Sequence, residues 1–154
     1  MSALRLRSMT PSEYAVFRER SEQEYAAEIA TARRLDEQSA AEQSARELDE
    51  LLPDGLGSPR MHLWTAEVDD EPVGLAWVEL RERPNGTSAW VFDVRVEESR
   101  RGEGLGRALM EALHEAGLGA SSVGLNVFGH STAARRLYES LGYEVTAQQM
   151  TRGL

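Results

Sequence analysis

The chain has 154 residues, of which 41% are apolar, and a formal net charge of -9, so we predict one domain, 1–154, with enough apolar residues for a core. The absence of cysteine excludes disulfides, thiolate metal sites and cysteine nucleophiles, and the acidic balance argues against nucleic-acid binding, which needs clustered basic side chains. No apolar run approaches the roughly 20 residues that span a bilayer, and the first residues lack a signal-peptide core, so we expect a cytoplasmic protein without a membrane partner.

A short strand and two helices are predicted for the first part of the chain. Residues 4–7 alternate apolar and charged side chains, the period-2 pattern of a strand, and Thr10-Pro11-Ser12-Glu13 can cap a helix. Residues 12–52 are rich in Ala, Glu, Arg and Leu with sparse apolar positions, which indicates two amphipathic helices broken near Leu35-Asp36. Proline and glycine then predict a loop at 53–59.

The remaining sequence predicts a sheet with further helices. Turn-forming sequences separate three strands of an antiparallel meander, at 61–68, 73–81 and 88–96. Strand and helix patterns then alternate, with a helix at 104–116, a strand at 122–127, a helix at 131–141 and a last strand at 143–150. This order predicts an α/β (α+β) fold with a mixed, mainly antiparallel central sheet and helices on both faces.

A glycine-rich segment, Arg101-Gly102-Glu103-Gly104-Leu105-Gly106, lies between a predicted strand and a predicted helix. Unpaired amides and the positive end of the helix dipole make such a position an anion site. The segment is not a P-loop, which needs Lys and then Ser or Thr after the last glycine, and a dinucleotide fingerprint would need glycine where Arg107 stands. Taken alone, the motif is equally compatible with a plain glycine turn that starts a helix.

Two linked blocks resemble the GNAT superfamily of N-acetyltransferases over about residues 73 to 143. Arg101, Gly104 and Gly106 match the family's pyrophosphate loop, and the segments 125–127 and 134–143 are similar to its later strand and helix. The resemblance implies the GNAT fold and acetyl-CoA as co-substrate. One position departs from the family pattern, because Ser131 stands where the family often has Asn; a serine can still cap the helix that follows.

The resemblance also implies which residues contact the cofactor. The backbone of a strand segment would pair with the pantetheine arm, the glycine loop would hold the pyrophosphate, and a basic side chain at the helix start would add charge beside it. Asn126 could hydrogen-bond the cofactor arm, and Ser131 occupies a position of cofactor contact in the family. The expected cofactor-binding residues are therefore Val94, Arg95, Val96, Arg101, Gly102, Gly104, Gly106, Arg107, Asn126 and Ser131.

Acetyl transfer to an amine needs a base, an oxyanion contact and an acid. The resemblance places Tyr138 where family members donate a proton to the departing sulfur, although an aromatic on an amphipathic helix can also be a core residue. Some relatives carry a Glu base where this chain has Asn126, and a neutral amide cannot take the proton. Asp93 and Glu79 are the carboxylates best placed within the central strands; we prefer Asp93, whose apolar sequence neighbours would raise its pKa. A carboxylate paired with an arginine is an equally weighted interpretation of Asp93.

The acceptor is expected to be a small-molecule or peptide amine. Acidic residues are frequent in 12–52 and would attract a cationic amine, although a solvated helix face explains them better. Polyamines, aminoglycosides, amino acids and peptide amines all remain open as acceptors. The three histidines are too scattered to predict a metal site, and a homodimer is expected only because dimers are the commonest closed assembly.

Two other functions remain open. A noncatalytic CoA-binding module would keep the fold without a working base, which the neutral side chain of Asn126 makes reasonable. An acyltransferase that uses a longer acyl-CoA would differ only in the space beyond the thioester.

Overall fold

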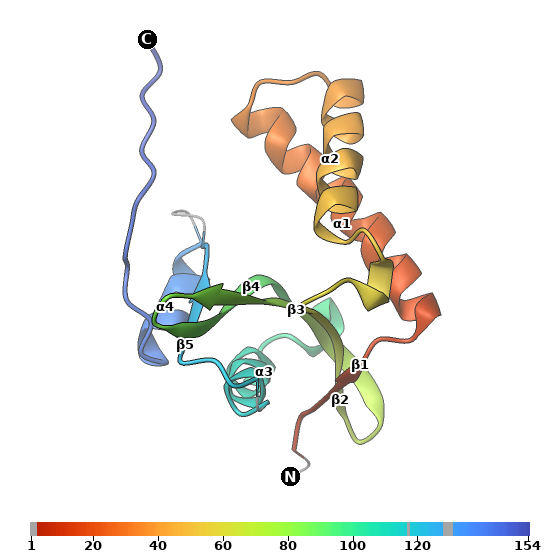
Figure 1. The fold of residues 1–154 in the computed structure, drawn as a ribbon, viewed down its shortest axis with the longest axis vertical. Coiled ribbons are helices and arrows are strands. Elements are labelled where there is room, and N and C mark those ends of the chain that lie inside the picture. Colours follow the sequence, from red (N-terminus) through yellow and green to blue (C-terminus); the bar gives the residue numbers. More distant parts are fainter. Residues whose placement is uncertain (1–2, 117, 128–130) are drawn as a thin grey trace.

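The computed structural model describes residues 3–116, 118–127 and 131–154, and shows a five-stranded sheet with helices on both faces (Figure 1). The helices and strands are β1 (Arg5–Ser8), α1 (Pro11–Ala32), α2 (Glu37–Leu51), β2 (Met61–Val68), β3 (Glu71–Arg83), β4 (Gly86–Val96), α3 (Leu105–His114), β5 (Ser122–Leu125) and α4 (Thr132–Ser140), with 3-10 turns at Gly55–Gly57 and Glu98–Arg100. None of the described helices has the length and hydropathy that crossing a bilayer requires.

The strands follow the order of the chain across the sheet, β1-β2-β3-β4-β5. Neighbours among the first four strands are antiparallel, and β5 pairs with β4 in parallel after the crossover through α3. The predicted mixed, mainly antiparallel sheet is therefore confirmed. The break between the first two helices also falls where the sequence indicated, because the side chain of Asp36 accepts a hydrogen bond from Ser39 N and so caps α2.

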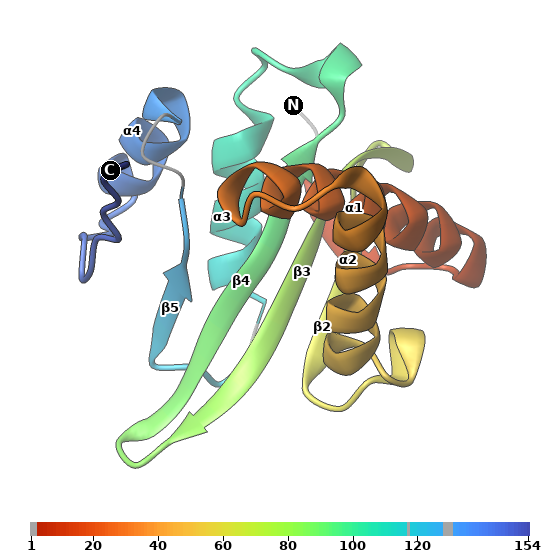
Figure 2. The same cartoon turned by 90° about the horizontal axis from the view of Figure 1, so that it is seen from above.

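Helices α1 and α2 cover one face of the sheet and α3 covers the other (Figure 2). An apolar cluster holds the helices against the sheet on each face. On one face, Phe17 of α1 and Leu48 of α2 are buried in a cluster with Trp77 of β3. On the other, Leu109 and Leu113 of α3 are buried in a cluster with residues of β2, β3 and β4. Each fully buried leucine contributes about 1.5 to 3 kcal/mol. The two faces of β4 are thus assigned to different helices, which decides where its side chains point.

The last predicted strand, 143–150, is not formed. This segment lies outside any helix or strand, and residues 144–150 are exposed. In Figure 1 the C-terminal segment runs away from the sheet. Alternation of apolar and polar residues supplies strand propensity but no neighbour, and a strand is stable only when its backbone groups find partners. The prediction was wrong because it assumed a neighbouring strand, and the described part of the chain contains none beside this segment.

Glu13 links β1 to the start of α1. Its carboxylate accepts hydrogen bonds from Arg7 Nη1 at 2.8 Å and from the Thr10 amide at 2.9 Å, and it completes a capping box with Thr10. The hydrogen bond from Arg7, in particular, lowers the pKa of Glu13 to about 2. A carboxylate with a lowered pKa in the folded state stabilises the fold fully above its ordinary pKa, and this contribution is lost as the pH falls toward the lowered value.

We therefore expect Glu13→Gln to lower the free energy of unfolding by about 1 kcal/mol at pH 7, with the difference from the native chain shrinking between the ordinary pKa of 4.5 and about 2. Urea denaturation at a series of pH values measures this. Glu50→Gln, at an exposed position of α2, is the matched control. If the free energy of unfolding of Glu13→Gln stays below that of the native chain by the same amount at every pH, the stabilisation does not come from the charge of Glu13.

Candidate active site

A β-bulge in β4 determines the direction of Asp93. In the pairing of β3 with β4, Trp77 lies opposite Asp93 and Val78 lies opposite Val91, so Phe92 is an extra residue in β4. Phe92 stacks on Trp77 with ring centroids 4.4 Å apart, and its neighbour Asp93 lies on the same side of the sheet, toward α1. A bulge changes the alternation of a strand in this way and is frequent beside active sites.

The bulge was missed at the level of the sequence, although a signal was present. Ala89 and Val91 belong to the apolar cluster under α3, and so do Val94 and Val96 after a break in the alternation. Strict alternation would have placed Asp93 in that cluster with them. The phase of the apolar positions therefore changes between Val91 and Val94, which is the pattern that an extra residue leaves.

An acidic cluster forms where β4 passes α1. Arg95 of β4 forms ion pairs with Glu24 of α1 at 2.6 Å and with Asp93 at 3.1 Å, and Arg20 lies 3.5 Å from Glu24. Burial raises the pKa of Asp93, and the charge of Arg95 opposes that shift. Partial desolvation, followed by the charges of Glu24 and Asp93, raises the pKa of Glu28. The predicted pairing of Asp93 with an arginine is thus present, within a group that has more carboxylates than guanidinium groups.

Tyr138 of α4 lies within the electrostatic reach of Asp93. Burial raises the pKa of its phenol, and the negative charge of Asp93 raises it further. The charge of Asp93 therefore acts on the expected acid, although 45 positions in the sequence separate the two residues. Glu79, the other expected carboxylate, is engaged by Arg81, whose Nε lies 2.5 Å from it and whose guanidinium lies over the ring of Trp90.

Strands β4 and β5 pair over only part of their length. The ladder joins Ser88–Val91 of β4 to Ser122–Leu125 of β5 and then stops, while β4 continues to Val96 on its β3 side. Figure 2 shows the two strands diverging from that point. Among the described residues, the edge of β4 around Val94 to Val96 therefore has no strand beside it on the β5 side. An extended ligand with amide groups could pair with such an edge.

The glycine loop leads directly into α3. Gly102 and Gly104 have φ angles of 82° and 78°, in the left-handed region, and Gly104 is the N-cap of α3 without a side-chain cap hydrogen bond. A Cβ atom at either glycine would meet nothing within 4 Å, so the space beside the loop is open. Uncapped amides at an open helix terminus suit a phosphate group. The residues present therefore fit the diphosphate of a coenzyme A.

The remaining residues of the expected cofactor site lie near these elements. Arg101 is exposed beside the loop, with its Nε 3.4 Å from the carbonyl oxygen of Val96. Arg107 donates a hydrogen bond to Ser140 Oγ at 2.5 Å, and a Cβ on Gly106 would contact Leu137, so α3 begins beside α4. These contacts hold the loop and the helix that carries Tyr138 together.

Two further expected residues flank the segment that leads from β5 to α4. Asn126 is exposed directly after β5. Ser131 occupies the N-cap position of α4 as expected, but its side chain makes no cap hydrogen bond.

The histidines have other contacts or lie outside the described residues. His62 packs beside Trp64, His114 Nε2 lies 2.7 Å from the hydroxyl of Tyr143, and His130, a weak candidate for cofactor contact, falls outside the described residues. The described parts of the chain contain no group of three or more potential metal ligands.

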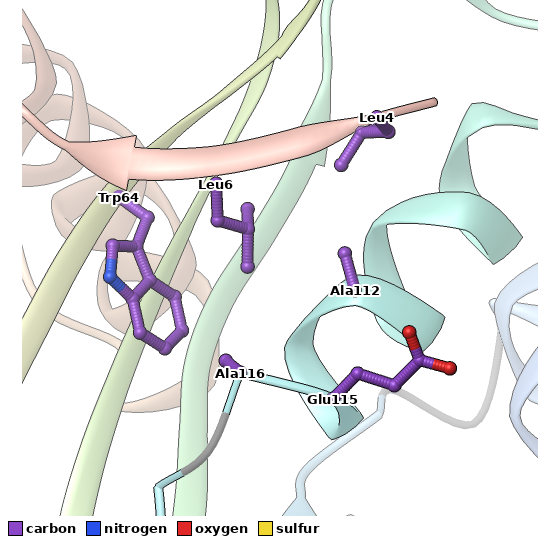
Figure 3. Close-up of a pocket in the computed structure, with 6 residues that line it drawn as sticks. All are labelled: Leu4, Leu6, Trp64, Ala112, Glu115 and Ala116. Atoms are coloured by element: carbon purple, nitrogen blue, oxygen red, sulfur yellow. The ribbon is translucent and has the colours of Figure 1, made fainter. Parts of the chain in front are cut away.

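A separate hollow of about 340 Å³ lies between β1, β2 and α3 (Figure 3). Apolar side chains and one carboxylate, Glu115, line it. Since β1 and α3 form it, this hollow is not the site of Asp93, whose neighbours are on α1. It offers no pair of acid and base among its lining residues.

β4 and β5 diverge beside the uncapped N-terminus of α3. This geometry suits a protein that holds an extended, negatively charged ligand against β4. Residues 16–143 match the model of the acetyltransferase (GNAT) family, and the chain belongs to this family. The chain is 30% identical over 155 residues to the uncharacterized N-acetyltransferase YdgE of Bacillus subtilis, with 99% of each chain covered. It is 32% identical over 108 residues to YycN of the same organism, which covers 68% of this chain and 69% of YycN. This chain is accordingly an N-acetyltransferase.

Solved structures agree with this family. The crystal structure of YycN from Bacillus subtilis superposes with a TM-score of 0.90 at 29% identity, covering 99% of both chains. The aminoglycoside N-acetyltransferase AAC(6')-Iy, solved in complex with CoA, superposes with a TM-score of 0.64 at 15% identity, covering 100% of this chain and 96% of that one, which shows the shared fold. Membership of the acetyltransferase family points to binding of an acyl-CoA.

The glycine at the N-cap of α3 provides a test of the loop. Gly104→Ala places a Cβ on a residue with a left-handed φ of 78°, at a cost of about 1 to 2 kcal/mol. We expect the loop to relieve this strain by turning its amides away from the ligand, so that affinity for CoA falls. A loss of about 1 to 2 kcal/mol corresponds to about a tenfold weaker affinity. Calorimetric titration with CoA measures the loss. Gly57→Ala, where φ is not positive and space is open, is the control; equal affinities in both variants would contradict a role of this loop.

Proposed function

We propose that this protein transfers the acetyl group of acetyl-CoA to a primary amine by direct attack on the thioester. The observation that carries the proposal is the opening between β4 and β5 beside the uncapped start of α3, with Asp93 on β4 and Tyr138 on α4 near enough for the charge of Asp93 to raise the pKa of the phenol. The amine nitrogen forms a bond to the carbonyl carbon, and the bond from that carbon to sulfur breaks. One proton leaves the attacking nitrogen, and one proton is supplied to the departing thiolate.

Asp93 is the proposed base. An alkylamine with a pKa of about 10.4 is neutral in only about one molecule in 10³ to 10⁴ at pH 7. A positioned base offsets much of this deficit, with typical gains of about 10² to 10⁴. Burial raises the pKa of Asp93, which makes its carboxylate more basic than an exposed one. The bulge at Phe92 supports this role because it turns the carboxylate away from the apolar cluster and toward α1.

Tyr138 is the proposed acid. Since burial and the charge of Asp93 raise the pKa of its phenol above 10, the hydroxyl carries its proton at neutral pH and can donate it to the thiolate. Amides of β4 between Val94 and Val96 are proposed to stabilise the oxyanion that forms on the carbonyl carbon. The cofactor itself supplies the activated thioester.

The cofactor is proposed to follow the open edge of β4 with its arm and to place its diphosphate on the glycine loop. The divergence of β4 from β5 supports the first contact, and the uncapped start of α3 supports the second. Arg101 and Arg107 are proposed to add positive charge there. The transferred group is proposed to be acetyl rather than a longer acyl chain.

A cationic amine is the proposed class of acceptor. Glu28 has no ion-pair partner among the described residues, and its neighbours Glu24 and Asp93 are also acidic. A second positive charge on the acceptor would reduce this repulsion. The aminoglycoside N-acetyltransferase with the same fold acts on a class of molecule that carries several amines, which agrees with the proposal. Polyamines and aminoglycosides are thus favoured over amino acids, whose carboxylate would be repelled.

The experiment is thiol release from acetyl-CoA with a panel of polyamines, aminoglycosides, amino acids and peptide amines. We expect turnover that depends on the added amine, lower KM values for the polycationic acceptors, and higher KM values with added salt. Tyr138→Phe should lower kcat about 10²-fold or more with little change in CoA affinity, because only the proton donor is removed. Tyr14→Phe, in the apolar cluster under α1 and α2, is the control.

Other results would overturn particular parts of this proposal. Binding of CoA without turnover across the whole panel would favour the noncatalytic CoA-binding module. Turnover that is unchanged in Tyr138→Phe would contradict the assignment of the acid. Faster turnover with longer acyl-CoA substrates would contradict the choice of acetyl.

A further inference from the structure

Helix α4, which carries the proposed acid Tyr138, contains no buried residue. Its nine residues therefore contribute little of the apolar burial that usually fixes a helix against its protein. A reacting group must nevertheless be held accurately, because a displacement of about 1 Å can cost about 10²-fold in rate. The position of Tyr138 thus depends on the individual contacts that α4 and the residues after it make with their neighbours.

The chain turns back at the end of α4 and brings Tyr143 beside Tyr138. Gly142 has a φ of 93°, in the left-handed region, and its amide donates to Glu139 O at 3.1 Å. The amide of Tyr143 donates to Tyr138 O at 3.0 Å, which completes a Schellman cap. The centroids of the two rings then lie 5.7 Å apart, a separation at which tilted aromatic rings attract each other. The cap therefore places the ring of Tyr143 against that of the proposed acid.

The hydroxyl of Tyr143 is bound by His114 of α3. Its oxygen lies 2.7 Å from His114 Nε2, and the centroids of the two rings are 5.6 Å apart. Burial, followed by the charge of the Tyr138 phenol, raises the pKa of Tyr143 to about 12, so its hydroxyl keeps its proton at neutral pH. A protonated hydroxyl can donate to an imidazole or accept from one. The side chain of Tyr143 is thus held at both ends, by the backbone cap and by His114.

Helix α3 connects this contact to the expected cofactor site. His114 is the last residue of α3, and Gly104, the N-cap at its other end, belongs to the loop proposed to hold the diphosphate. Near that end, Arg107 donates to Ser140 Oγ at 2.5 Å and so binds the last residue of α4. The ten residues of α3 span about 15 Å. One helix therefore contacts the proposed diphosphate site, the end of α4 and the hydroxyl of Tyr143.

We propose that Tyr143 is a positioning residue for Tyr138, and that His114 holds it in that role. The inference rests on the proposed function, in which Tyr138 gives its proton to the departing sulfur. The ring of Tyr143 packs against that of Tyr138 and limits the rotation of its side chain, while α3 sets the distance of both from the diphosphate. Tyr143 itself transfers no proton, because its hydroxyl is engaged by His114.

The test removes the hydroxyl of Tyr143 and the acid, separately and together. Tyr143→Phe keeps the ring and loses the contact with His114, so we expect kcat to fall about tenfold with little change in the KM for acetyl-CoA. In the background of Tyr138→Phe the same substitution should not lower kcat further, since no acid remains to be positioned. Tyr25→Phe, which also removes a hydroxyl with a hydrogen-bond partner, is the matched control. Circular dichroism establishes that each variant is folded.

Substitutions at His114 test the same contact from α3. His114→Leu removes the partner of the hydroxyl and should lower kcat as much as Tyr143→Phe does. His114→Gln, whose amide can bind the hydroxyl, should restore most of kcat. NMR spectra with ring-labelled tyrosine should show a contact between the rings of Tyr138 and Tyr143 in the native chain and in His114→Gln, and a weaker one in His114→Leu. This last measurement needs no turnover.

Two kinetic results would overturn the role of Tyr143 and leave the proposed function standing. One is a native value of kcat in Tyr143→Phe. The other is a loss in Tyr138→Phe/Tyr143→Phe that equals the product of the two single losses, because Tyr143 would then act independently of Tyr138. Absence of the ring contact from the native spectrum would also overturn the role. A native enzyme that turns over no amine of the panel would overturn the proposed function, and the role of Tyr143 with it.

Discussion

The extra residue in β4 is the constraint on which the candidate site depends. Up to Val91, β4 alternates between the apolar cluster under α3 and the face covered by α1, and it pairs with β5. Phe92 adds one residue, stacks on Trp77, and brings Asp93 to the face of α1 instead of the cluster that contains Leu109. Pairing with β5 ends at the same point. One local irregularity therefore turns a carboxylate toward Arg95 and α1, and it leaves free the backbone edge that an acyl-CoA would need.

Burial of charge at this point is made tolerable by Arg95. A carboxylate removed from water is strongly destabilised unless a cation or a hydrogen bond compensates it. Arg95 reaches both Asp93 and Glu24, and so it joins β4 to α1 across 71 positions of the sequence. Compensation is incomplete, because Glu28 adds a further carboxylate and its pKa is raised. This excess of carboxylates is the basis of the proposed cationic acceptor.

Local signals allowed much of the fold to be predicted. The strand at 61–68, the helix break near Asp36 and the glycine loop all depend on short-range chemistry, namely alternation, capping and backbone freedom. The contact of Arg95 with Glu24 could not be predicted, since it depends on how α1 crosses the sheet. The prediction of a strand at 143–150 was wrong for a related reason. The segment has strand propensity, but among the described residues no strand lies beside it. For Asp93, the pairing with an arginine that the sequence left open is present, and its role as a base stays a prediction.

The most direct test of this account is the pH dependence of kcat/KM for an alkylamine acceptor, in the native enzyme and in Asp93→Asn. A carboxylate base combined with a protonated amine predicts a plateau, which begins above the ordinary pKa of aspartate because burial raises the pKa of Asp93, and which extends to the pKa of the amine near 10.4. Without the base, kcat/KM should instead follow the free amine, rising about tenfold per pH unit through neutrality and lying about 10² to 10⁴ below the native value at pH 7. Profiles of the same shape and height in both enzymes would contradict the role of Asp93.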